Sequence, residues 1–303
     1  MNRFKKILVN LALDDQDEAL LAYAGKVAVL SGADKIYVVH VSGQLDIPEE
    51  IRAQYPAMLE PADEFIASEM KEKVKSFLDA PGTVSVDVDV YSGNPLDEIL
   101  KLAARKDIDL LVTGRKPEVK ESGSLAEKLT RKAPCSVLTV TCCTIGSFER
   151  ILLPVDFSEN SLYALDVASA WASAAGSRSL DILNVYRVPA GFHKTGKSYD
   201  EFAEIMKKNA AREYEKFIKD TDLRGVEASP HFLLNDNFSR GILQAIDERF
   251  TDLVVMASRG RSGVITSLLG SATERILSQT DVPLLAVKQK GSGIGLLKLL
   301  LEI

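Results

Sequence analysis

A loop with spaced glycines is the stretch of this sequence best suited to holding a ligand. Gly260 and Gly270 are separated by nine residues, and Ser271 follows directly. Glycine lets backbone N–H groups approach an anion closely, and a serine hydroxyl can donate a hydrogen bond to a phosphate oxygen. The pattern predicts a phosphate-binding loop. The alternative is that it forms only a tight turn.

The neighbouring segments place this loop between a strand and a helix. The apolar run Leu253–Met256 is typical of a buried strand, and residues 272–277 have the composition of a helix. The first N–H groups of a helix have no partner within it and carry a partial positive charge, so they attract phosphate. Ser271 and Glu274 also fit a capping box, which leaves open the alternative that Ser271 only caps the helix.

The elements that must position this loop occur in two copies. The strand Ile7–Leu11 matches the run that begins at Ile151, an offset of 144 residues. Asp109 matches Asp252 at an offset of 143. A nearly constant offset over most of both halves indicates a tandem duplication.

The duplication predicts two domains and a tail. We expect domains at residues 1–145 and 149–290, followed by an apolar tail at residues 291–303. Each domain is long enough to bury its own core. The tail is too short to cross a membrane, and we expect it to pack on its own domain or on a partner.

In each copy, short apolar runs typical of buried strands alternate with segments that have the apolar spacing of amphipathic helices. In the first copy the expected strands are residues 7–11, 35–41, 83–91, 110–113 and 136–140, and the expected helices are residues 14–30, 64–78, 95–104 and 125–131. This alternation predicts an α/β fold: two tandem doubly wound domains, each a five-stranded parallel sheet with helices on both faces. Such sheets bind ligands at the carboxyl ends of their strands, which is the edge that carries the glycine loop.

Composition and charge narrow the class of protein. The 303 residues are 46% hydrophobic and 26% charged with a net charge of −6, which is typical of a globular protein and lacks a basic signature for nucleic acid. Three cysteines make neither a disulfide framework nor a metal site. No apolar run reaches the roughly 20 residues that a membrane span needs. We therefore expect a cytoplasmic protein without a nucleic-acid or membrane partner.

Over nearly its whole length the chain resembles the universal stress protein family in its tandem two-domain form. The nucleotide-binding members of that family carry Gly-x-x-Gly, nine residues, then Gly-Ser or Gly-Thr. Here Gly260, the nine following residues and Gly270-Ser271 match, while Ala257 stands at the first glycine. The turn at residues 154–158 is similar to the first strand-to-helix turn of the family.

The resemblance implies an adenine nucleotide (ATP, ADP or AMP), with or without Mg²⁺, in the second domain. Asp156 would bind the ribose hydroxyls, and the backbone of Val185 would meet the adenine. Arg261 could add charge-assisted hydrogen bonds to the phosphates. The predicted nucleotide-binding residues are Pro154, Val155, Asp156, Val185, Met256, Ala257, Gly260, Arg261, Gly270, Ser271 and Ala272. The alternative for Asp156 is that it caps the helix beginning near Ser158.

The first domain lacks the features that a nucleotide would need. Ala12 stands where the second copy has Asp156, and Pro117 stands where it has Gly260. Proline has no N–H to offer, and the acidic Glu118 in the same loop would repel phosphate. We predict that the first domain binds no nucleotide in this mode.

No catalytic residue can be read from the sequence, because no histidine, cysteine or carboxylate pair stands in a recognisable arrangement. The main hypothesis is an ATP-binding stress-response or regulatory protein. The alternatives are a weak ATPase or phosphotransfer enzyme, and a nucleotide-independent dimeric scaffold. The resemblance also implies that residues 135–140 and 282–287 pair within one chain as a pseudo-dimer, and a homodimer is left open.

Overall fold

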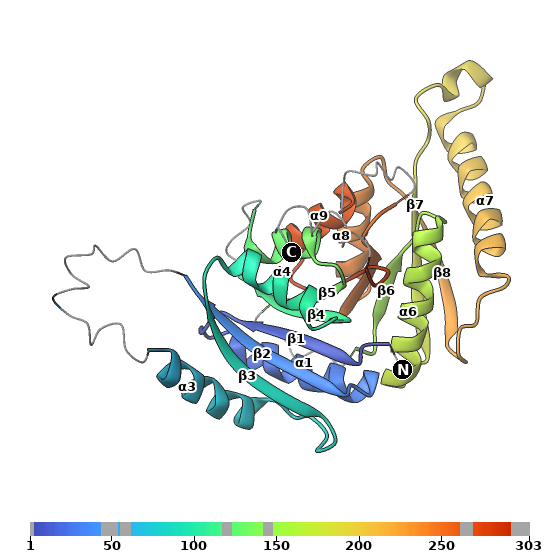
Figure 1. Cartoon of the computed structure of the whole chain (residues 1–303). Helices are drawn as coiled ribbons and strands as arrows, with labels where there is room; N and C mark the ends of the chain where they lie inside the picture. The colour runs from blue at the N-terminus through green and yellow to red at the C-terminus, as the bar shows by residue number, and fades with distance from the viewer. Residues whose placement is uncertain are drawn as a thin grey trace. The chain divides into compact units, whose positions relative to one another are not determined.

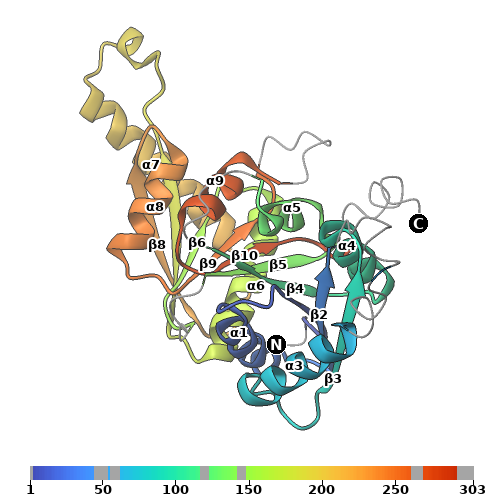
Figure 2. The same cartoon turned by 90° about the vertical axis from the view of Figure 1, so that its left-hand side faces the viewer.

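A computed structural model of the chain describes residues 3–43, 54, 62–116, 123–141, 148–260 and 269–291. They form two compact units, which are described separately below and drawn in Figures 1 and 2. Lys290 and Gly291 belong to the first unit, where Lys290 Nζ contacts Asp107 Oδ2 at 2.8 Å and Asp109 Oδ1 at 2.7 Å. The rest of the predicted tail and the pair Cys142-Cys143 lie outside the described residues.

The first unit is a five-stranded parallel sheet with strand order β3-β2-β1-β4-β5. Its elements are β1 (Lys6–Leu11), α1 (Asp17–Ser31), β2 (Lys35–Ser42), α3 (Ala62–Phe77), β3 (Ser85–Ser92), α4 (Pro95–Arg105), β4 (Leu110–Arg115), α5 (Leu125–Lys132) and β5 (Ser136–Thr141). The predicted doubly wound fold is confirmed. Every predicted end lies within three residues of the observed one.

The second unit repeats this topology with strand order β10-β9-β6-β7-β8. Its elements are β6 (Ile151–Pro154), α6 (Glu159–Ala175), β7 (Ser179–Tyr186), η2 (Phe192–Thr195), α7 (Tyr199–Ile218), β8 (Glu227–Leu234), α8 (Phe238–Glu248), β9 (Leu253–Ala257), α9 (Ser271–Gln279) and β10 (Leu284–Val287). Figure 1 shows α7 and α8 on opposite sides of β7. The strand order reverses between β6 and β9, the place where doubly wound sheets open for a ligand.

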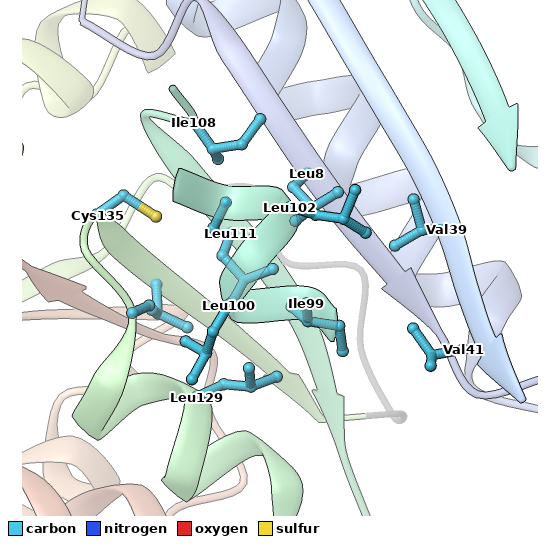
Figure 3. Packing of buried hydrophobic residues seen from close by; sticks show 13 residues of the cluster. Leu8, Val39, Val41, Ile99, Leu100, Leu102, Ile108, Leu111, Leu129 and Cys135 are labelled. Atoms are coloured by element: carbon cyan, nitrogen blue, oxygen red, sulfur yellow. The ribbon is translucent and has the colours of Figure 1, made fainter. Parts of the chain in front are cut away.

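Apolar strands make the core of each unit because both faces of a parallel sheet are covered by helices. In the first unit, a buried cluster between the sheet and helices α4 and α5 includes Leu8, Leu100, Leu111, Leu129 and Val137 (Figure 3). The matching cluster under α8 and α9 in the second unit includes Leu152, Ile246 and Val254. The two copies therefore bury the same layer with equivalent residues.

Two local details differ from the sequence-based expectation. Helix α1 begins at Asp17 instead of residue 14, because Leu13 takes a left-handed conformation with φ 60° and Asp14 Oδ1 accepts a hydrogen bond from the backbone N–H of Gln16 at 3.0 Å. The sequence spacing places Phe65 on the same apolar stripe of α3 as Met70, but the structure buries Met70 and leaves the Phe65 side chain 70% exposed. Among the described residues, no helix is long and apolar enough to cross a membrane.

Candidate functional site

A cavity of about 570 Å³ opens in the second unit at the carboxyl ends of β6, β7 and β9. It is bounded by the turn after β6, the loop after β9, the first turns of α8 and α9, and one face of α7. The structure brings together ten of the eleven predicted residues on its walls: Pro154, Val155, Asp156, Val185, Met256, Ala257, Gly260, Gly270, Ser271 and Ala272. The eleventh, Arg261, lies outside the described residues.

Asp156 organises the turn between β6 and α6. Its Oδ1 accepts hydrogen bonds from the backbone N–H of Ser158 at 3.0 Å, from Ser158 Oγ at 2.6 Å and from Ser161 Oγ at 2.7 Å. The N-cap of α6 is Ser158, whose Oγ accepts from the N–H of Ser161 at 3.3 Å. The alternative in which Asp156 is itself the cap is therefore wrong, because one of its oxygens holds the capping serine in place.

The residue after Asp156 bends the chain sharply away from the sheet. Phe157 has φ 61°, a left-handed conformation that costs a non-glycine residue about 1–2 kcal/mol. Its ring packs edge-on against Phe217 of α7 with centroids 5.4 Å apart, and this packing holds the turn. Leu13, at the equivalent position of the first unit, has φ 60°. The bend thus belongs to both copies, whereas the carboxylate belongs to one.

The bend after β6 leaves part of β7 without a neighbour on that side. The N–H of Val155 donates to the carbonyl of Leu183 at 2.8 Å, the last backbone hydrogen bond between these two segments among the described residues. Backbone groups alternate sides along a strand, so the N–H and C=O of Val185 face the same side as those of Leu183. Val185 also lines the cavity, so its backbone offers one donor and one acceptor there.

The loop after β9 is tied at both ends. The N–H of Gly270 donates to the carbonyl of Ser258 at 2.7 Å, and Thr273 Oγ1 donates to the carbonyl of Ala257 at 3.1 Å. At Gly260 an added Cβ would lie 2.7 Å from Asp156 Oδ2, so a larger residue would require the carboxylate or the loop to shift. These contacts hold the first turn of α9 at the end of β9.

Helix α9 begins one residue earlier than the capping-box pattern requires. Its N-cap is Gly270, which supplies no side-chain cap, and Ser271 is the first helical residue. The alternative in which Ser271 caps the helix is therefore wrong. The cause is the hydrogen bond from Gly270 to Ser258, which draws Gly270 into the cap position. Ser271 and Ala272 line the cavity, and first-turn N–H groups such as theirs have no partner within a helix.

Sequence reasoning missed the wall that α7 provides. Met206, Asn209, Ala210 and Glu213 line the cavity at the spacing of one helix face. That spacing is the available signal, but it looks like an ordinary amphipathic stripe. The segment that precedes α7, residues 189–198, contains η2.

Three further cavity residues were also missed. Arg187 follows β7, Phe238 begins α8, and Arg259 follows β9. Each lies at the start of a helix or within two residues of the end of a strand, and this position is the signal that could have identified them. The two arginines place positive charge on the cavity wall.

The equivalent edge of the first unit holds a buried ion pair. Asp17 takes the place of Ser161, and its Oδ1 accepts from the N–H of Ala12 at 3.1 Å. Its Oδ2 contacts Lys73 Nζ of α3 at 3.1 Å, and the carboxylate is only 1% exposed. This burial raises the pKa of Asp17 above its ordinary value, although Lys73 acts in the opposite direction.

Two more side chains occupy the space around this ion pair. Gln16 is buried, and its Oε1 lies 3.1 Å from the point that a Cβ on Gly114 would reach. Arg115, the last residue of β4, is 4% exposed. The predicted loop residues Pro117 and Glu118 lie outside the described residues. Among the described residues, the first unit thus places buried polar side chains in the region equivalent to one wall of the cavity of the second unit.

The described residues contain no group of three or more histidine, cysteine, aspartate or glutamate side chains placed to hold a metal ion. Among the described residues that line the cavity, the carboxylates are Asp156 and Glu213, and Glu213 Oε1 is 2.8 Å from Lys216 Nζ. The described polar groups on the cavity wall can supply hydrogen bonds and charge to a ligand.

Comparison with known proteins gives consistent results for both halves. A family model described as "Universal stress protein family" matches residues 3–141 and again residues 147–288. A universal stress protein of Thermus aquaticus is 30% identical over 141 residues, which are 46% of this chain and 99% of the relative. Universal stress protein MJ0577 of Methanocaldococcus jannaschii is 25% identical over 166 residues, covering 48% of this chain and 98% of the relative.

A solved structure matches nearly the whole length of the chain. The crystal structure of a universal stress protein from Archaeoglobus fulgidus covers 94% of this chain and 96% of its own, with a TM-score of 0.66 and 22% identity. At this identity the likeness supports the fold.

Proposed function

The chain belongs to the universal stress protein family, and on that premise we propose that its second domain binds one adenine nucleotide as a regulatory ligand in a stress response. The first domain binds none in this mode. The convergence of ten predicted residues on a single cavity is the observation that carries this proposal.

The cavity brings together polar groups of the kinds that a nucleotide requires. Asp156 lines the cavity, and a carboxylate can accept the hydroxyl groups of a ribose, as it does in dinucleotide-binding folds. Val185 offers a backbone donor and acceptor to the edge of an adenine. Gly260 allows the loop after β9 to pass directly beside Asp156, so that sugar and phosphates can be held side by side.

The phosphate end combines three sources of affinity. The first turn of α9 presents N–H groups and the Ser271 hydroxyl, and Arg259 adds a fixed positive charge nearby. Mg²⁺ would accompany a triphosphate mainly through phosphate oxygens and water. No step of the proposal requires a protein ligand to the metal.

The first domain supports the restriction to one site. Ala12 cannot accept a ribose hydroxyl, and the buried pair of Asp17 with Lys73 stands where the second domain has the cavity-lining Ser161. A ligand in that position would have to displace Lys73 from the buried carboxylate of Asp17, and leaving a buried charge unpaired costs free energy. We therefore assign nucleotide binding to the second domain alone.

We propose binding without turnover. No histidine or cysteine is among the described residues that line the cavity, Oδ1 of Asp156 accepts three hydrogen bonds from Ser158 and Ser161, and we assign its other oxygen to the ribose hydroxyls. A general base for water needs a free position next to the substrate. Glu213 is held by Lys216.

The test is to purify the full chain without added nucleotide, denature it, and identify the released nucleotide by chromatography. The purified chain is then incubated with Mg-ATP and assayed for ADP. We expect released adenine nucleotide, or ATP binding when none is released, together with ADP formation no faster than in buffer. Turnover abolished by Asp156→Ala would favour the weak ATPase. If the purified chain neither carries a bound nucleotide nor binds ATP, the nucleotide-independent dimeric scaffold would be the remaining hypothesis.

A further inference from the structure

One aromatic side chain at the mouth of the cavity has an exposure that core packing does not explain. Phe238 is the first residue of α8, lines the cavity, and is 45% exposed. The guanidinium carbon of Arg187 lies 5.6 Å from the centroid of its ring. An exposed ring stacked with a guanidinium is a flat surface that combines apolar and cationic character.

The position of this pair relates it to the backbone of Val185. Arg187 is two residues beyond Val185, at the point where β7 leaves the sheet. Across the cavity from α8, the helix α7 contributes Met206 to the opposite wall, since α7 and α8 lie on opposite sides of β7 (Figure 1). A flat group that reaches Val185 would therefore lie between an apolar side chain and a planar pair.

We infer that Phe238 and Arg187 form a stacking platform for the nucleobase and make the site prefer purines to pyrimidines. This inference rests on the proposed function, because it concerns the base end of the same ligand. Stacking on an aromatic ring grows with the area of the base, and a purine has two fused rings where a pyrimidine has one.

The first unit offers an internal comparison. Helices α4 and α8 both begin after an asparagine N-cap, Asn94 and Asn237. The next residue is Pro95 in the first unit and Phe238 in the second. At the offset of 144 that relates the strands, Arg187 corresponds to Gly43. The copy that we predict to bind no nucleotide thus lacks both side chains of the platform.

A purely structural role for Phe238 makes a different prediction. If the ring served only as an apolar cover for the start of α8, leucine would replace it without loss of binding. If the ring is a platform, leucine keeps the apolar volume but loses the flat face. Phe238→Leu therefore separates the two roles, and Phe238→Ala gives the full loss.

The experiment measures the affinities of ATP, CTP and inorganic tripolyphosphate for the full chain by calorimetry. We expect ATP to bind roughly tenfold more tightly than CTP to the unchanged protein, and both Phe238 variants to reduce ATP affinity by roughly tenfold. Tripolyphosphate affinity and the thermal midpoint of Phe238→Leu should be unchanged. Arg187→Gln should also reduce the preference for ATP over CTP, as the Phe238 variants do.

A matched control is Phe250→Leu, which alters a 72% exposed ring of the same unit that is not among the cavity-lining residues. It should leave every affinity unchanged. Equal ATP affinities for Phe238→Leu and the unchanged protein would overturn the platform while the proposed function stands. Failure of the unchanged protein to bind ATP would overturn the proposed function, and the platform with it.

Discussion

Asp156 and Gly260 approach so closely that a Cβ at residue 260 would lie 2.7 Å from Asp156 Oδ2. The two residues follow β6 and β9, the strands between which the order of the sheet reverses. Oδ1 of the same carboxylate holds the start of α6 through Ser158 and Ser161. One side chain therefore joins the turn after β6, the start of α6 and the loop after β9.

Removing the charge of Asp156 should separate its two roles. Asp156→Asn keeps an oxygen for Ser158 and Ser161, so we expect little loss of stability but at least a tenfold loss of ATP affinity. Asp156→Ala should lose the same affinity and also about 1–2 kcal/mol of stability, because the hydrogen bonds that fix the α6 cap disappear. Calorimetric titration and urea unfolding measure the two effects.

The matched control is Asp14→Ala in the corresponding turn of the first unit. Asp14 Oδ1 accepts from the N–H of Gln16, and its Oδ2 contacts Lys116 Nζ at 3.0 Å. This variant should lose stability without changing ATP affinity. An unchanged ATP affinity in Asp156→Asn would contradict the assigned role.

Gly260→Ala should displace the loop from Asp156. The added methyl group has no space beside Oδ2, so either the carboxylate or the loop must shift, and we expect ATP affinity to fall roughly tenfold. Gly191→Ala is the control, because a Cβ there meets no atom within 4 Å. Equal ATP affinities for the two variants would show that the close approach has no part in binding.

Gly241→Ala tests the position of Val185 from the opposite side. A Cβ at residue 241 would lie 2.9 Å from Val185 Cγ1 and 3.2 Å from its Cγ2. We expect a loss of about 1–3 kcal/mol of stability by overpacking and a weaker ATP affinity, measured by thermal unfolding and calorimetry. Adding Val185→Ala removes both methyl groups and should restore much of the affinity. A double variant no better than Gly241→Ala would argue against this coupling.

The order of strands and helices could be predicted because the spacing of apolar residues differs clearly between the two kinds of element. Runs such as Leu253–Met256 are too short and too continuous for a helix, and the repeat gave each element a second copy. The ends of strands then located the ligand edge. The residues near those ends, including Asp156 and Gly270, could be predicted for that reason.

Other features depend on contacts between segments that are distant in the sequence, so they could not be predicted from the sequence alone. The cap of α9 shifts to Gly270 because of a hydrogen bond to Ser258, which lies twelve residues earlier. The left-handed conformation of Phe157 is rare for a large side chain and depends on packing against Phe217. The domain limits, the role of the tail and the pairing of the two domains stay predictions.

Asp17 should give the first unit a distinctive response to pH. Its pKa is raised in the folded protein by burial, so the protonated form is favoured there. The contribution of this group to stability is therefore complete below the unfolded pKa of 3.8 and is lost as the pH rises through the folded pKa. Asp17→Asn removes this dependence.

Urea unfolding of both proteins at a series of pH values between 7 and 4 measures the effect. The free energy of unfolding of the unchanged protein minus that of Asp17→Asn should become more positive as the pH falls. Asp34→Asn serves as the control, since that side chain is 72% exposed. A difference that does not vary with pH would contradict the assignment.

The central claim is that one nucleotide binds to each chain, in the second domain. Calorimetric titration of the full chain with ATP, after bound nucleotide has been removed, tests it most directly. We expect a stoichiometry of one, and loss of that binding in Asp156→Ala but not in Asp14→Ala. A stoichiometry of two, or a single site that survives Asp156→Ala and disappears in Asp14→Ala, would contradict it.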